Sequence, residues 1–144
     1  MYKLGKSYEE ILLGEKASFT KTITEADITI YAGLTGDFNP IHIDAEYAKT
    51  TRFGERIAHG TIALGLIAPV VGMKLPGMGS ILLHQEAKFT APVKIGDTIT
   101  AEAEVVEKIE KNKSVKLKTR FYNQNNIEVI LGTITMLPPK KAEL

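Results

Sequence analysis

The sequence predicts an α+β domain in which an antiparallel sheet wraps around one apolar helix. Apolar residues occupy nearly every position from Gly60 to about Val71, which is typical of a helix buried on all sides. Further along, positions 99–105 and 115–121 alternate between apolar and polar residues, as strands with one wet face do. Because an apolar helix must be shielded from water and each strand has one apolar face, we expect the sheet to pack around the helix.

Length and composition favour one globular domain, residues 1–144, of which 44% are hydrophobic. The formal net charge of +1 comes from 18 basic and 17 acidic residues that are interspersed, so nothing indicates a nucleic-acid partner or a membrane surface. The apolar run 61–73 is too short to cross a bilayer, and the N-terminus has no stretch typical of a signal peptide. Cysteine is absent, which is compatible with a reducing compartment, and we expect a cytoplasmic protein.

The first elements follow from local signals. Residues 16–22 are polar and β-prone and predict a strand. A helix should begin at Thr24, because Asp27 completes a capping box and Ile23 and Ile28 are spaced as a hydrophobic staple. This helix should end near Gly36.

Residues 38–58 contain Pro40, Gly54 and many charges, and predict a long irregular excursion with one helical turn around 46–50. A loop of this length in a compact domain usually carries function. In the apolar helix that follows, Pro69 should remove the hydrogen bond to the Gly65 carbonyl and kink the helix. Four strands complete the chain, over 80–90, 99–105, 115–121 and 127–136, and the last two hairpins turn at 111–113 and 123–126.

The candidate site begins with Asp37 and His42, two side chains suited to proton transfer. On a continuous helix, residues five apart would point about 140° away from each other. Pro40 is expected to stop the helix between them, so that both side chains are aimed at one point and share one water molecule.

The second half of the candidate site is His59-Gly60, at the start of the apolar helix. The Gly60 N–H has no intrahelical partner, and a glycine lets a ligand approach, so this N–H could polarise a substrate carbonyl. We expect His59 to fix the loop through hydrogen bonds. Carbonyl activation with a positioned water suits the addition of water to an α,β-unsaturated carbonyl or the hydrolysis of an acyl compound.

Each residue also has a structural interpretation. Asp37 and Asn39 could be ordinary turn residues, and His42 a partly buried histidine satisfied by the backbone. His84 is expected to be structural, and Lys49, Arg52 and Arg56 are expected to form a solvated face, with a phosphate contact as the less favoured alternative. A two-histidine, one-carboxylate metal site made of His42, Asp44 and His59 is disfavoured, because all three side chains would have to converge.

Four runs taken together resemble the MaoC-like dehydratases, also called hydratase 2 or (R)-specific enoyl-CoA hydratases. They are YAGLTGDFNPIHID (31–44), IAHG (57–60), LPGMGSI (75–81) and PVKIGD (92–97). The resemblance implies the hot-dog fold, an antiparallel sheet wrapped around a long central helix. It also implies reversible hydration of trans-2-enoyl-CoA to (R)-3-hydroxyacyl-CoA.

By the same resemblance, Asp37 and His42 are the catalytic pair that holds the water, and the Gly60 N–H polarises the thioester carbonyl. Which of the pair is base and which is acid stays open. Asn39 would orient the loop. The resemblance further implies a homodimer, an acyl-CoA substrate and no prosthetic group or metal, coenzyme A being part of the substrate. The sequence departs from the family at Ala68, where some relatives carry a serine, and at Pro69.

Two alternatives remain beside the hydratase. A thioesterase on the same fold would need a carboxylate on or near the central helix, and residues 61–71 contain none. A non-catalytic acyl-CoA-binding domain is disfavoured by the intact pair of Asp37 and His42.

Overall fold

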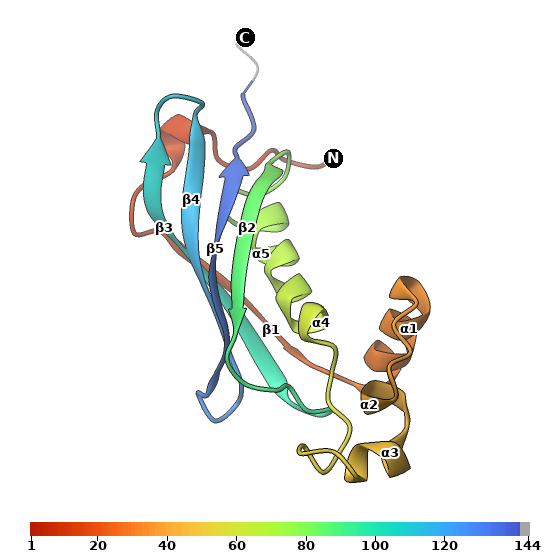
Figure 1. Cartoon of the computed structure of the whole chain (residues 1–144). Helices are drawn as coiled ribbons and strands as arrows, with labels where there is room; N and C mark the ends of the chain where they lie inside the picture. The colour runs from red at the N-terminus through yellow and green to blue at the C-terminus, as the bar shows by residue number, and fades with distance from the viewer. Residues whose placement is uncertain (142–144) are drawn as a thin grey trace.

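Five antiparallel strands form one curved sheet in the computed structural model, which describes residues 1–141 (Figure 1). Along the sheet the strands lie in the order β1-β3-β4-β5-β2, so β1 and β2 are the edges. The strands are β1 (Lys16–Thr22), β2 (Ile81–Phe89), β3 (Thr98–Ile109), β4 (Ser114–Tyr122) and β5 (Glu128–Leu137). The predicted fold class and all five predicted strands are confirmed.

The sheet buries one face and exposes the other, as the alternation predicts. The inner face carries Leu117 and Phe121 of β4 and Ile99 of β3, which are fully buried. Both predicted hairpin turns are present, and Lys113 and Asn126 supply the positive φ angles in them. Register slips between Val105 and Glu107 leave a bulge in β3.

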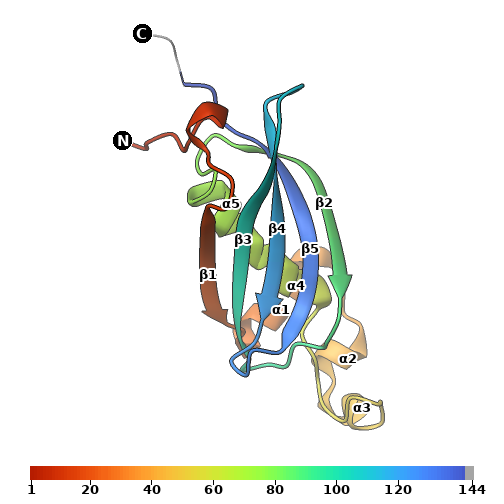
Figure 2. The same ribbon diagram turned by 90° about the vertical axis from the view of Figure 1, so that its left-hand side faces the viewer.

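A helical segment of three parts crosses the inner face of the sheet (Figures 1 and 2). It consists of α4 (Gly60–Leu64), a single 3-10 turn η2 (Gly65–Ile67) and α5 (Ala68–Met73). Pro69 lies in the first turn of α5, where its missing N–H leaves no bond unmade. The α-helical hydrogen bonding is interrupted by a 3-10 turn just before Pro69, and the expected kink stays a prediction.

The expectation that this helix is buried on all sides is wrong. The face toward the sheet is buried, with Ala63 and Val70 fully covered. The opposite face carries Thr61, Gly65 and Ala68, which are exposed. A five-stranded sheet can cover only one side of a helix, so the apolar composition of the other side is not explained within one chain.

The first helix, α1 (Glu25–Thr35), forms as its capping signals predict. The Thr24 hydroxyl accepts from the Asp27 N–H, and the Asp27 carboxylate accepts from the Thr24 N–H. A hydrogen bond from the Lys21 ammonium, 2.6 Å away, with the one from the Thr24 N–H, holds the pKa of Asp27 below its usual value. Ile23 and Ile28 are both buried in the core.

The excursion between α1 and α4 contains two short helices, α2 (Pro40–Ile43) and α3 (Ala45–Lys49). The helical turn predicted near 46–50 is confirmed as α3, whereas α2 was not expected. With α1, these helices stand beyond the end of α4, to the side of the sheet (Figure 1). A 3-10 turn, η1 (Tyr8–Glu10), precedes β1. Within residues 1–141, no helix is long and apolar enough to span a membrane.

Candidate functional site

Asp37 lies just beyond the end of α1, but Pro40 is not what ends the helix. Gly36 ends it, in the left-handed conformation with φ of 80°, and its N–H donates to the Ala32 carbonyl. Pro40 is instead the first residue of α2. The prediction of a break between Asp37 and His42 is confirmed, and the residue to which it was assigned is corrected.

The Asp37 carboxylate is held at one oxygen and open at the other. Oδ1 accepts from the Asn39 N–H at 3.1 Å, while Oδ2 faces His42. The Asn39 side chain caps α2 by accepting from the Ile41 N–H at 3.3 Å. The Asp37 side chain is 50% exposed, so a substrate can reach it. Asn39 thus orients the loop twice, through its backbone and through its side chain.

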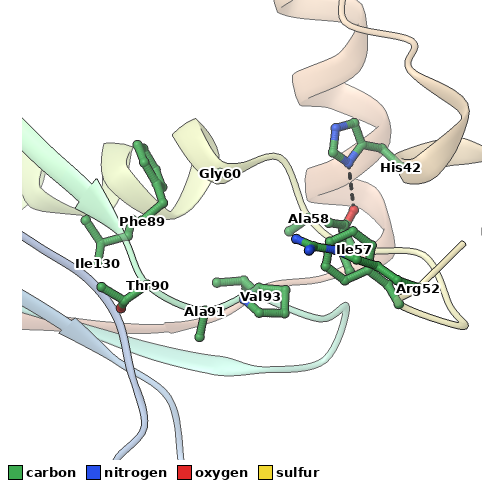
Figure 3. Close-up of a pocket in the computed structure, with 12 residues that line it drawn as sticks. His42, Arg52, Ile57, Ala58, Gly60, Phe89, Thr90, Ala91, Val93 and Ile130 are labelled. Carbon is green, nitrogen blue, oxygen red and sulfur yellow. Dashed lines mark hydrogen bonds between the residues drawn. The ribbon is translucent and has the colours of Figure 1, made fainter.

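His42 lies on α2, is nearly buried and is fixed in one orientation. Its Nδ1 donates to the Ile57 carbonyl at 2.8 Å (Figure 3). Because a carbonyl only accepts, Nδ1 carries the hydrogen and the neutral ring presents the Nε2 lone pair. This Nε2 lies 3.8 Å from Asp37 Oδ2, a distance that suits two acceptors holding one water molecule. The predicted convergence of Asp37 and His42 is present.

His59 supports both members of the pair. Its Nε2 donates to the Asp37 carbonyl at 2.9 Å, and its ring stacks on His42 with centroids 3.9 Å apart. The Tyr31 and His59 rings pack in a T-shaped arrangement, with their centroids 4.9 Å apart. His59 is 2% exposed, and its Nδ1 is buried without a hydrogen-bond partner among the described residues. The expected hydrogen bond from His59 to the loop is present.

Gly60 begins α4, directly after His59. A Cβ on Gly60 would lie 3.2 Å from two ring carbons of Phe89, so a side chain at this position would press against Phe89. Its N–H is among the first four of the helix, which have no partner within the helix. The position suits a close approach of a ligand to the backbone.

Gly60 and His42 both line one cavity of about 330 Å³ (Figure 3). The rest of its wall is mostly apolar and comes from the residues before α4 and from the end of β2 onward. It includes Ile57, Phe89, Ala91, Val93 and Ile130. Asp37 does not line this cavity, but its Oδ2 lies 3.8 Å from the Nε2 of His42, which does. A mostly apolar cavity with a few polar groups at its wall is typical of a small-molecule site.

The three basic residues expected on a solvated face have different surroundings. Lys49 pairs with Glu46 in solvent, as expected. Arg52 is exposed and lines the cavity. Arg56 is not solvated: its Nε donates to the His42 carbonyl at 2.8 Å, and its other nitrogens hold both oxygens of Glu25. Arg56 therefore fixes α2 against the start of α1.

A metal site is not what the geometry favours. Asp44 caps α3 and is not near the histidines' free nitrogens, but ligand atoms of Asp37, His42 and His59 do lie within 4.8 Å of one another. One nitrogen of each ring already donates to a carbonyl. Each remaining lone pair lies in the plane of its own ring. Because the two rings are stacked, with 26° between their planes, these lone pairs do not point toward one ion. The set is better suited to proton transfer.

Three contributors to the site were not predicted from the sequence: Tyr31, Arg56 and the carbonyl of Ile57. Each acts through a residue that is distant in the chain, namely His59, Glu25 and His42. No local motif indicates such pairs. The many charged residues of the excursion were the one feature of the sequence consistent with side-chain hydrogen bonds there.

Comparisons with known proteins agree with this geometry. A family profile described as "MaoC like domain" matches residues 11–126. The chain is 43% identical to an (R)-specific enoyl-CoA hydratase of Rhodospirillum rubrum over 93% of this chain and 92% of that protein. It resembles an unliganded R-hydratase from Pseudomonas aeruginosa with a TM-score of 0.89 and 43% identity, over 97% of this chain and 92% of the other.

A second solved structure gives the same result. An (R)-hydratase from Aeromonas caviae, described as involved in PHA biosynthesis, has a TM-score of 0.88 and 36% identity to this chain. The match covers 91% of this chain and 99% of the other. The predicted hot-dog architecture is thereby confirmed.

Proposed function

The chain belongs to the MaoC-like dehydratase family, and we propose that it is an (R)-specific enoyl-CoA hydratase that reversibly hydrates trans-2-enoyl-CoA to (R)-3-hydroxyacyl-CoA. The observation that carries the proposal is the 3.8 Å approach of Asp37 to His42, which lines a cavity together with Gly60. In chemical class it is a hydro-lyase.

In the proposed reaction, Asp37 and His42 hold the attacking water. The carboxylate Oδ2 and the neutral Nε2 are both acceptors, so together they can bind both hydrogens of one water molecule. As its oxygen bonds to C3, one proton passes to the pair and the C2–C3 π electrons move toward the thioester carbonyl. The pair then returns a proton to C2 on the same face, and no net proton is gained or lost.

Gly60 is assigned to the thioester carbonyl. Negative charge develops on that oxygen as water adds, and the Gly60 N–H would stabilise it as an oxyanion-hole donor does. His59 and Asn39 are assigned supporting roles. The His59 Nε2 donates to the Asp37 backbone carbonyl and the Asn39 N–H donates to the Asp37 Oδ1, and both bonds leave Oδ2 free. The reaction needs no prosthetic group and no metal, since coenzyme A enters with the substrate.

We further propose that two copies of this single-domain chain form a homodimer in the cytoplasm. Within residues 1–141, strand β2 pairs only with β5, and its other edge is open. Ile81, Leu82 and Leu83 on that strand are about half exposed, and beside them lies the uncovered face of α4 and α5. An open edge beside an apolar face favours pairing with a second copy.

The proposed function is tested with crotonyl-CoA. We expect loss of the enoyl-thioester absorbance and formation of the (R)-3-hydroxy product, identified by chiral chromatography. Release of free thiol without hydration would identify a thioesterase instead. Binding without any turnover would indicate an acyl-CoA-binding domain, and either result overturns the proposal.

A further inference from the structure

Two hydroxyl groups near the site have no role in the reaction described so far. The Tyr31 hydroxyl, on α1, is hydrogen-bonded to the Thr61 hydroxyl, on α4. Tyr31 also packs its ring edge on His59, and Thr61 directly follows Gly60 in the chain. The hydroxyl pair therefore lies in the same cluster as the residues assigned to proton transfer and to the carbonyl.

Only one of the two hydroxyl protons is used in the hydrogen bond between Tyr31 and Thr61. Of two bonded hydroxyls only one donates to the other, and the more acidic phenol of Tyr31 is the natural donor. Thr61 then keeps its own proton, for which residues 1–141 offer no other acceptor. A hydroxyl that already accepts a hydrogen bond becomes a better donor through polarisation.

The Thr61 side chain is on the face of α4 that this chain alone leaves uncovered. It is exposed and lines a second cavity, of about 410 Å³, between the uncovered helix face and strands β2 and β5. Gly60, which directly precedes Thr61 in the chain, lines the first cavity. Three hydroxyl side chains line the two cavities. Those of Thr90 and Ser80 donate to backbone carbonyls, whereas Thr61 has a proton to give.

A thioester oxygen that gains negative charge can accept two hydrogen bonds, and Gly60 supplies one. We infer that Thr61 is a further catalytic residue whose hydroxyl donates the second hydrogen bond to the thioester oxygen, with Tyr31 as the positioning residue that orients it. This inference rests on the proposed function, because it assigns a donor to the same carbonyl.

The competing explanation is that the pair only ties α1 to α4. Kinetics with matched variants separates the two explanations. Thr61→Val removes the hydroxyl and keeps the shape, and it should lower kcat on the order of 10²-fold with little change in KM. Thr61→Ser should retain most of the activity. Tyr31→Phe should cause a smaller loss, and the double variant Tyr31→Phe/Thr61→Val should be no slower than Thr61→Val alone.

Two controls carry the same chemical changes elsewhere. Thr29→Val removes a hydroxyl on α1 that bonds only to the Glu25 carbonyl, and Tyr122→Phe removes one on β4. Both should keep normal kcat. If Thr61→Val loses stability in urea unfolding in proportion to its loss of activity, the pair is a structural tie and the inference is wrong.

A second measurement reports on the carbonyl directly. Crotonyl-CoA labelled with ¹³C at the thioester carbonyl is bound to the Asp37→Asn variant, and its C=O stretch is recorded by infrared difference spectroscopy. Adding Thr61→Val should move the stretch back toward its frequency in water. An unchanged stretch overturns the inference even when the wild type is a hydratase. A wild type that does not hydrate crotonyl-CoA overturns the proposed function and, with it, the catalytic role of Thr61, whatever the stretch does.

Discussion

The sheet and the excursion from Gly36 to Gly60 are held together by different forces. The inner face of the sheet is apolar and closely packed, with Leu117 and Phe121 inaccessible to solvent. The excursion is held in its own shape by single polar bonds, such as those from His42 to Ile57 and from His59 to Asp37. Apolar burial is non-directional, whereas each of these bonds sets an orientation.

The comparison shows why the pair proposed to be catalytic, Asp37 and His42, lies in the excursion. A packed sheet supplies stability but offers few exposed polar groups. The excursion supplies the pair but has little core of its own, with Ala48 and Ala58 among its few buried apolar side chains. Substitutions in the two regions should therefore separate activity from stability.

The largest effect is expected at the catalytic pair. Asp37→Asn or His42→Ala removes one of two acceptors for the water, and kcat for crotonyl-CoA should fall by about 10²- to 10⁴-fold. The urea midpoint of Asp37→Asn should stay close to that of the wild type, because Asp37 is half exposed and contributes no core packing. His42→Ala removes a nearly buried ring and its bond to the Ile57 carbonyl, so its kcat is measured below its own unfolding transition. Near-normal turnover in either variant contradicts the site assignment.

The converse effect is expected in the sheet. Leu117→Ala leaves a cavity under the helix and should lower the free energy of unfolding by about 2–5 kcal/mol. Below the unfolding transition kcat should be unchanged. Lys118→Ala, on the exposed face of the same strand, is the control and should stay within about 0.5 kcal/mol. A large loss of kcat in folded Leu117→Ala would contradict the prediction that the sheet affects stability and the excursion affects activity independently.

An intermediate effect is expected where a polar bond connects the excursion to α1. Arg56→Met frees the His42 carbonyl and Glu25, so α2 should lose its fixed position and kcat should fall about tenfold. Stability should change by no more than about 1 kcal/mol, since Glu25 is largely solvated. The control, Arg120→Met on the outer face of the sheet, should keep full activity.

The smallest effect is the acid sensitivity of the α1 cap. The pKa of Asp27 is lowered in the folded state, so its stabilising contribution is present above its ordinary pKa of 3.8 and is lost as pH falls below that value. Urea midpoints measured from pH 5 to about pH 3 should therefore decline less for Asp27→Asn than for the wild type. Parallel declines would show that the cap contributes nothing to this pH dependence.

Much of the fold could be predicted because its signals are local. The capping box of Thr24 and Asp27 acts within one turn, and the alternation of β3 and β4 is set by a period of two. The excursion was harder. Pro40 was interpreted as a stop, yet the same ring begins a helix when a capping residue such as Asn39 precedes it.

The sequence alone was sufficient for the fold class and the family, because both follow from local patterns and short motifs, and it nominated Asp37, His42 and Gly60 as candidate site residues. The 3.8 Å approach of the pair, the tautomer of His42 and the uncovered face of α4 and α5 became known only from the tertiary structure. These depend on contacts between distant segments, such as His42 with Ile57 and Tyr31 with Thr61, and packing of the whole chain decides which distant groups meet.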